Sequence, residues 1–263
     1  MDQNIKTPKI SINIATYNRG QYIAEAVNSV LAQTFSDWEL LIVDDASTDN
    51  TEMVIAPYLK DQRIKYFKNE KNINVCRTRN IALEKSVGKY IAVLDSDDFW
   101  PDTQKLEKQV AFLEANQDYG VVGTAVIVVN KTGKEIKRFQ HPLSDKKIKS
   151  QLLVKNPFSH SSTIFPRSLI LDIGGYDNDL NGIEDYPLWL KLGLNWKFAN
   201  LPDYSLKYRV HGLNISLIGR KRLMRINLKL IRSSKHDYPH YYWAITRRLT
   251  RYWLYCLLIW FNF

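Results

Sequence analysis

The sequence predicts an α/β fold, a mostly parallel sheet with helices on both faces. Two observations lead to this prediction. Short apolar, β-branched segments alternate with segments of helical periodicity through the first hundred residues. Three of the apolar segments end in polar loops, and in parallel sheets the loops at the carboxyl ends of strands line the ligand crevice. We therefore expect these three loops to converge.

The elements of the first half follow one another in order. Strands are expected at residues 10–15, 39–43, 64–67 and 90–94, and helices at residues 22–31, 51–59, 75–86 and 105–115. Asp49, followed three residues later by Glu52, is typical of a helix start and supports the second helix. This alternation of strand and helix is what a parallel sheet requires.

The second half has a different pattern. It predicts a hairpin of strands at 120–129 and 135–139 around a turn at 131–133, a strand at 161–165, a tight turn at Gly174 and Gly175, a helix at 186–192 and a strand at 204–210. We assign residues 1–219 to one domain and residues 220–263 to a basic, aromatic helical tail.

The formal net charge of +10 is concentrated in the tail. Residues 220–263 carry ten Lys and Arg against one acid, whereas residues 1–219 carry 27 against 26. This distribution argues against a nucleic-acid partner. The two cysteines lie far apart and match neither a disulfide framework nor a zinc site. The polar N-terminus lacks the apolar core of a secretory signal, so we expect a cytoplasmic location.

Ten aromatic residues follow residue 237, interleaved with Arg247, Arg248 and Arg251. The apolar run at 253–261 is shorter than the roughly 20 residues that span a bilayer. Because mixed basic and aromatic residues suit lipid headgroups, we expect the tail to lie on the inner face of the cell membrane. A helix packed on the first domain or on a dimer partner is the alternative. The sequence indicates no oligomeric state.

Three carboxylates, Asp95, Asp97 and Asp98, follow the expected strand at 90–94. Such an oxygen-rich cluster suits a hard divalent cation, Mg²⁺ or Mn²⁺, which keeps open positions for substrate phosphates. A solvated turn that caps the next helix is the alternative interpretation.

Asp44 and Asp45 close the strand at 39–43. A carboxylate at this position can accept a hydrogen bond from the ring N–H of a pyrimidine or from a ribose hydroxyl. An Asx turn with Ser47 is the alternative. Arg79, near the start of the helix at 75–86, could hold a phosphate or a base.

Four motifs together resemble family 2 glycosyltransferases. They are SINIATYN at 11–18, VDDASTD at 43–49, RN at 79–80 and LDSDD at 94–98, and the similarity extends over residues 8–215. The resemblance implies a GT-A fold, which is Rossmann-like, and a nucleotide-sugar donor. It implies a donor site made of Thr16, Tyr17, Asn18, Asp44, Asp45, Arg79, Asp95 and Ser96, and a metal, Mn²⁺ or Mg²⁺, held by Asp97 with Asp95.

Two further segments resemble elements of the same family. Glu184 and Asp185, before the helix at 186–192, resemble a motif that implies Asp185 as the catalytic base. Such a base must be ionised near the acceptor hydroxyl, and we expect the helix N-terminus to keep it so; a simple helix cap is the alternative. His211, in the segment YRVH, is implied to contact the donor diphosphate. Asn74 replaces a glycine of the family, and asparagine tolerates the left-handed backbone that the turn needs.

The resemblance implies an inverting transfer of a sugar from a nucleoside diphosphate, UDP above all, to a hydroxyl of a glycan or lipid-linked acceptor in the synthesis of a bacterial-type surface polysaccharide. A polyprenyl-phosphate glycosyltransferase and an inactive, membrane-bound sugar- or nucleotide-binding module of the same fold are the alternatives. A nucleotidyltransferase or a dehydrogenase would need a glycine-rich loop after the first strand, and this sequence has none there.

Overall fold

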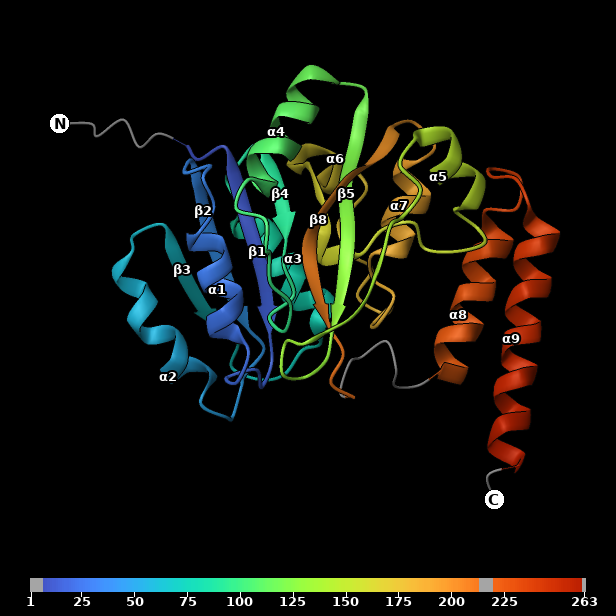
Figure 1. Cartoon of the computed structure of the whole chain (residues 1–263), viewed down its shortest axis with the longest axis horizontal. Coiled ribbons are helices and arrows are strands. Elements are labelled where there is room, and N and C mark those ends of the chain that lie inside the picture. Colours follow the sequence, from blue (N-terminus) through green and yellow to red (C-terminus); the bar gives the residue numbers. More distant parts are fainter. Residues whose placement is uncertain (1–6, 213–219, 262–263) are drawn as a thin grey trace.

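The structure is a computed structural model that describes residues 7–212 and 220–261. The strands are β1 (Ile10–Thr16), β2 (Trp38–Asp44), β3 (Ile64–Lys68), β4 (Tyr90–Val93), β5 (Tyr119–Val129), β6 (Glu135–Phe139), β7 (Ile164–Pro166) and β8 (Lys197–Arg209). They form one sheet in the order β3-β2-β1-β4-β7-β5-β6, with β8 paired to β5 (Figure 1). Four of the seven strand pairings in this described sheet are parallel. The prediction of a mostly parallel α/β fold is confirmed.

The helices flank this sheet. They are α1 (Ile23–Leu31), α2 (Thr51–Ile55), α3 (Val75–Lys85), α4 (Lys105–Ala115), α5 (Asp145–Gln151), α6 (Arg167–Asp172), α7 (Tyr186–Leu192), α8 (Arg220–Ser233) and α9 (Tyr241–Phe261), with 3₁₀ turns η1 (Ala56–Lys60) and η2 (His160–Ser162). In Figure 1, α1 lies in front of the β1–β3 half of the sheet and α3 lies behind it.

Side-chain alternation along the strands separates the core into two clusters. On one face, Ile12 and Ile14 of β1 pack with α1 and α4. On the other face, Ile91 and Val93 of β4 pack with α3, α6 and α7. Because successive strand residues point to opposite sides, buried residues at every position need a helical layer on both faces. Both layers are present.

Several elements differ from the sequence-based expectation: β8 begins at Lys197 rather than at residue 204, and α5 and α6 were not predicted. Two further differences have a local reason. The helix expected at 51–59 ends as α2 at Ile55 and continues as η1, where Pro57 has no N–H to donate. The strand expected at 161–165 is shortened to β7, because η2 precedes it. In that turn the hydroxyls of Ser162 and Thr163 donate to the backbone carbonyls of Ser159 and His160, a local alternative to strand pairing.

The tail packs on the rest of the chain. Helices α8 and α9 lie side by side at one end of the molecule (Figure 1). Ile231, Tyr238 and Ala244 are buried in the same cluster as α7, and the Tyr238 hydroxyl donates to the Leu190 carbonyl over 2.7 Å. At Gly193 a Cβ atom would meet the Tyr238 oxygen at 2.5 Å, so this glycine permits the close approach. The boundary expected at residues 219 and 220 borders residues 213–219, outside the described part.

Candidate active site

A cavity of about 770 Å³ lies at the carboxyl ends of β1, β2 and β4. The arrowheads of these strands point to one edge of the sheet in Figure 1. The pairing of Thr16 with Asp44 places the loops after β1 and β2 side by side. The predicted donor residues that line the cavity are Thr16, Tyr17, Asp45, Arg79, Asp95, Ser96 and Asp97, and the predicted base Asp185 lines it too. The structure thus brings the expected loops together.

The end of β1 and the loop after it supply two side chains that could contact a ligand, Thr16 and Tyr17. The Thr16 hydroxyl is buried and finds no hydrogen-bond partner in the described part of the chain, although Thr16 borders the cavity. Tyr17 is 43% exposed and could stack against a base. Asn18 instead uses its side-chain oxygen to accept a hydrogen bond from the Thr48 amide over 2.8 Å. Asn18 therefore fixes the loop rather than facing the cavity, which differs from the expected donor contact.

Asp44 and Asp45 point to opposite sides at the end of β2. Asp44 is fully buried: one oxygen accepts from Ser47 and the other from the Tyr66 hydroxyl over 2.7 Å. The sequence-based placement of Asp44 in the donor site therefore has no support in this geometry, and the Asx-turn alternative describes it. Asp45 borders the cavity, as expected.

Asp45 also shapes the loop opposite it. Its carboxylate accepts hydrogen bonds from the Ile73 and Asn74 amides over 2.8 and 3.0 Å. Asn74 has φ 83°, in the region that favours glycine, and its side chain caps α3 by accepting from the Arg77 amide. The expectation that asparagine preserves this turn is confirmed.

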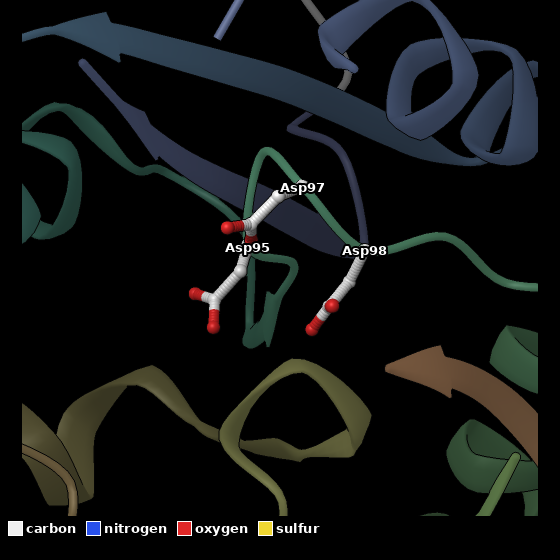
Figure 2. Close-up of side chains that lie close together, drawn as sticks. All are labelled: Asp95, Asp97 and Asp98. Atoms are coloured by element: carbon white, nitrogen blue, oxygen red, sulfur yellow. The ribbon is translucent and has the colours of Figure 1, made fainter. Parts of the chain in front are cut away.

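Three carboxylates meet on the turn after β4. Figure 2 shows the side chains of Asp95, Asp97 and Asp98 close together, and each offers an oxygen within 4.8 Å of the others. Asp95 and Asp97 border the cavity, whereas Asp98 is 1% exposed. Burial and then the charges of Asp97 and Asp95 raise the pKa of Asp98 well above its usual value.

Asp98 acts as a structural anchor. Its oxygens accept from the Ser161 hydroxyl over 2.6 Å and from the Arg209 amide over 2.8 Å, which fixes the acidic turn to β8. The pair that remains for a cation is Asp95 with Asp97. Two carboxylates that border a cavity large enough for a nucleotide fit a hard divalent cation.

Two cationic or protonatable side chains hold Asp97. His211 Nε2 lies 2.7 Å from an Asp97 oxygen, and Arg19 Nε lies 3.4 Å from the same oxygen. The His211 ring stacks on Tyr22 at a centroid distance of 5.2 Å. His211 thus reaches the site through Asp97 and does not border the cavity, in contrast to the expected contact with the diphosphate.

Arg79 joins the acidic turn to the predicted acceptor side. Its guanidinium donates to Asp95 over 2.6 Å and to Glu184 over 3.4 Å, and its side chain is 8% exposed. Burial, the largest single effect, raises the pKa of Asp95, but the charge of Arg79 and its hydrogen bond bring that pKa below its usual value. Asp95 is therefore a carboxylate at neutral pH.

Asp185 borders the cavity directly before α7. Burial first and the charge of Glu184 second raise the pKa of Asp185 to about 6. Its Oδ2 accepts a hydrogen bond from the side-chain amide of Asn156 over 2.7 Å and another from the Trp189 ring N–H over 3.3 Å. No donor from the described residues binds Oδ1. A pKa of about 6 still leaves Asp185 mostly ionised at neutral pH, as expected, although its side chain makes no cap hydrogen bond among the described residues.

Several cavity residues escaped the sequence analysis. They are Arg19, Asn156 and His160. Arg247, Arg248 and Arg251 of α9 also line the cavity. Only Arg19 had a signal in the sequence, its place directly after the first polar loop motif.

The sequence analysis assigned the arginines of α9 to contacts with a membrane. The described part of the tail packs on the first domain, which was the alternative, and none of the described helices is both long enough and apolar enough to cross a membrane.

Comparisons with known proteins find glycosyltransferases among the relatives of this chain. EpsE of Bacillus subtilis, a putative glycosyltransferase, is 34% identical over 189 residues, which cover 70% of this chain and 66% of the relative. WfgD of Escherichia coli, a UDP-Glc:alpha-D-GlcNAc-diphosphoundecaprenol beta-1,3-glucosyltransferase, is 33% identical over 219 residues, 82% of this chain and 83% of the relative.

Solved structures share the GT-A fold. S. aureus TarS 1-349 in complex with UDP-GlcNAc has a TM-score of 0.70 at 22% identity, over 85% of this chain and 66% of that one. The mannosyltransferase PcManGT from Pyrobaculum calidifontis, in complex with GDP-Man and Mn²⁺, has a TM-score of 0.68 at 17% identity, over 94% of this chain and 74% of that one. The profile described as Glycosyl transferase family 2 matches residues 11–174. On these matches, the chain belongs to glycosyl transferase family 2.

Proposed function

We propose that the protein is an inverting glycosyltransferase that moves a sugar from UDP to a hydroxyl of a glycan or lipid-linked acceptor, in the synthesis of a bacterial-type surface polysaccharide. One observation carries this proposal: the Asp95 and Asp97 pair and Asp185 line a single cavity. A leaving diphosphate and an attacking hydroxyl need these two kinds of group within one site.

The donor half of the cavity suits a nucleoside diphosphate. Tyr17 offers an aromatic face to the base. The Thr16 hydroxyl, which has no hydrogen-bond partner among the described residues, and the Asp45 carboxylate offer polar contacts to the nucleoside. Asp95 and Asp97 would hold Mn²⁺ or Mg²⁺, which when bound supplies positive charge to the leaving diphosphate. Arg19, beside Asp97, adds a cation on the same side.

The acceptor half suits base catalysis. Asp185 is anchored at Oδ2 by Asn156 and Trp189, so Oδ1 can take the proton from an acceptor hydroxyl. Attack by that hydroxyl on the anomeric carbon displaces the nucleoside diphosphate and inverts the centre in one step. The Asp185 carboxylate becomes a carboxylic acid in this step, and it returns the proton to solvent when the products depart.

The relatives support the choice of substrates. WfgD is named for a UDP-glucose donor and a diphosphoundecaprenol acceptor, and TarS binds UDP-GlcNAc. We carry UDP and a lipid-linked acceptor over to this chain as part of the proposal. The inactive module and the polyprenyl-phosphate glycosyltransferase are the competing functions.

A nucleotide panel tests the proposal. The thermal shift of the full chain is measured with UDP, GDP and dTDP and their common sugars, each with and without Mn²⁺, because a ligand that binds only the folded state raises its stability. We expect the largest shift with UDP or a UDP-sugar, and we expect it to require the metal. UDP release on addition of acceptor separates an enzyme from an inactive module. No shift with any nucleotide would contradict the proposal.

The pH dependence of kcat gives a second check. Since Asp185 must be ionised to take a proton and its pKa is raised to about 6, kcat should fall about tenfold per pH unit below that value. Glu184 raises this pKa, so Glu184→Gln should move the acid limb to lower pH. A kcat that stays level down to about pH 5 would contradict the role of Asp185.

We also propose that the tail holds the protein on the inner face of the cell membrane. Tyr242, Trp243 and Trp253 are 82%, 62% and 67% exposed on α9, and aromatic rings at such positions favour the headgroup region. The apolar run expected to lie on the membrane is described only at its start, since no side chain from residue 254 onward is described. Deleting the tail would uncover the cluster around Ile231 and Tyr238, so point variants are the better test.

Vesicle sedimentation measures this attachment. With vesicles that contain phosphatidylglycerol, Trp243→Ser with Trp253→Ser should lower the bound fraction by roughly tenfold, because each exposed ring loses its burial in the interface. Met53→Ser with Ile136→Ser removes two exposed apolar side chains outside the tail and serves as the control. Equal sedimentation of both double variants with the wild type would refute attachment through α9.

A further inference from the structure

A basic cluster, defined as Lys155, Arg247, Arg248 and Arg251, lines the same cavity as Asp185. Lys155 follows α5, and the three arginines lie on α9, where positions 247, 248 and 251 share one side of a helix. Within residues 7–212 and 220–261, none of the four forms an ion pair with a carboxylate. These four basic side chains therefore border the cavity without a close ion pair to a described carboxylate, although Glu184 and Asp185 line the same cavity.

Two of the arginines are fixed by backbone carbonyls. Arg247 Nη1 donates to the Val154 carbonyl over 2.8 Å, and Arg248 Nη2 donates to the Leu153 carbonyl over 3.1 Å. The Arg248 guanidinium also lies 5.7 Å from the centre of the ring of Tyr186, the residue that follows Asp185 in the sequence. The Nε of Arg248 is buried and has no hydrogen-bond partner among residues 7–212 and 220–261. Arg247 and Arg248 are thus fixed by backbone carbonyls, and the Arg248 Nε–H is available to donate a hydrogen bond to a ligand.

The charges of the cluster repel one another. Burial first, and then the charges of Arg247 and Arg251, lower the pKa of Lys155. A bound anion would relieve this repulsion and would pair with guanidinium groups in the two-point geometry that suits phosphate.

A second cavity, of about 460 Å³, begins where the first ends. Val154, Lys155 and Arg247 line both cavities, and the second continues to His240 and the exposed Trp243. The cluster therefore stands at the junction between the site of chemistry and the outer side of α9.

We propose that the basic cluster binds the diphosphate group of a lipid-linked acceptor. The acceptor sugar then lies toward Asp185, and the hydrocarbon chain runs through the second cavity toward Trp243. The inference rests on the proposed function, because it assigns one part of the acceptor of that reaction. A phospholipid headgroup carries similar chemistry, but a ligand that must reach Asp185 fits a cluster inside the active-site cavity better than a headgroup that stays in the bilayer surface.

The test uses undecyl diphosphate as probe, titrated into the full chain with UDP and Mg²⁺ present, so that the donor diphosphate site is filled, and again without them. Lys155→Gln with Arg251→Gln removes the two members whose side chains are exposed. Lys229→Gln with Arg232→Gln removes two exposed charges of α8 that line neither cavity and is the matched control. Undecyl glucoside, with the same chain and no phosphate, is the control ligand.

We expect the probe affinity of the cluster variant to fall by roughly tenfold to a hundredfold, with the α8 control and the binding of undecyl glucoside unchanged. Equal affinity of the cluster variant and wild type would overturn the proposal, as would an equal loss for undecyl glucoside. A loss confined to sedimentation with phosphatidylglycerol vesicles would assign the cluster to headgroups and overturn it too. Failure of the proposed function is distinct: UDP then causes no thermal shift, while the titration without UDP still measures the cluster.

Discussion

Replacing Asp185 by asparagine should lower kcat by roughly 10²–10⁴-fold and leave donor binding intact. The amide keeps an oxygen that can accept from Asn156 and Trp189, so the wall of the cavity is preserved. What the variant loses is a group that can take the proton of the acceptor hydroxyl. The measurement is kcat at saturating donor, together with the thermal shift caused by UDP and Mn²⁺.

The control for this variant is Asp179→Asn, which removes an exposed carboxylate that does not border the cavity. Its kcat should equal that of the wild type. Normal turnover of Asp185→Asn would remove Asp185 from the mechanism and would direct the search for a base to Glu184, the adjacent carboxylate of the cavity wall.

The second large effect is expected at Asp97. Asp97→Ala should abolish the metal-dependent part of UDP binding and lower activity by roughly 10²–10³-fold, because a carboxylate that would hold the cation is gone while Arg19 and His211 lose their shared anion. Thermal shifts with UDP, measured with and without Mn²⁺, separate the loss of metal binding from a loss of turnover.

Two comparisons make that result specific. Asp97→Asn keeps an oxygen for His211, so it reports the lost charge with less change in structure. Asp203→Ala removes a half-buried carboxylate paired with Lys108, away from the cavity, and should behave as the wild type. A metal-dependent UDP shift of normal size in Asp97→Ala would show that the cation is held elsewhere.

The sequence predicted the parts of this site that depend on local order. Strand periodicity placed Asp95 and Asp97 at the end of a buried strand, and parallel pairing brought them to the edge that also carries Thr16 and Asp45. Asp185 was predicted through the family resemblance, and its position in the cavity is consistent with that prediction.

The remaining features depend on contacts that local patterns do not encode. Asp44 and Asp45 are adjacent carboxylates, and only the orientation of the last residues of β2 decides that Asp44 bonds Tyr66 while Asp45 borders the cavity. The partner of Arg79, Glu184, lies 105 residues away. The raised pKa of Asp185 is likewise a result of burial by distant elements, which its position before a helix does not encode.

The packing of α9 against the first domain has a consequence for biosynthesis. Chains emerge from the ribosome N-terminus first, and N-terminal units tend to fold first. The strands that carry Thr16, Asp45 and Asp97 can therefore assemble before Arg247 has been made. The cavity gains its α9 wall only after α9 docks, so a nascent chain would acquire its nucleotide-binding loops before the surface that we assign to the acceptor. On the proposed assignment, an unfinished chain would lack the surface that holds a lipid-linked acceptor.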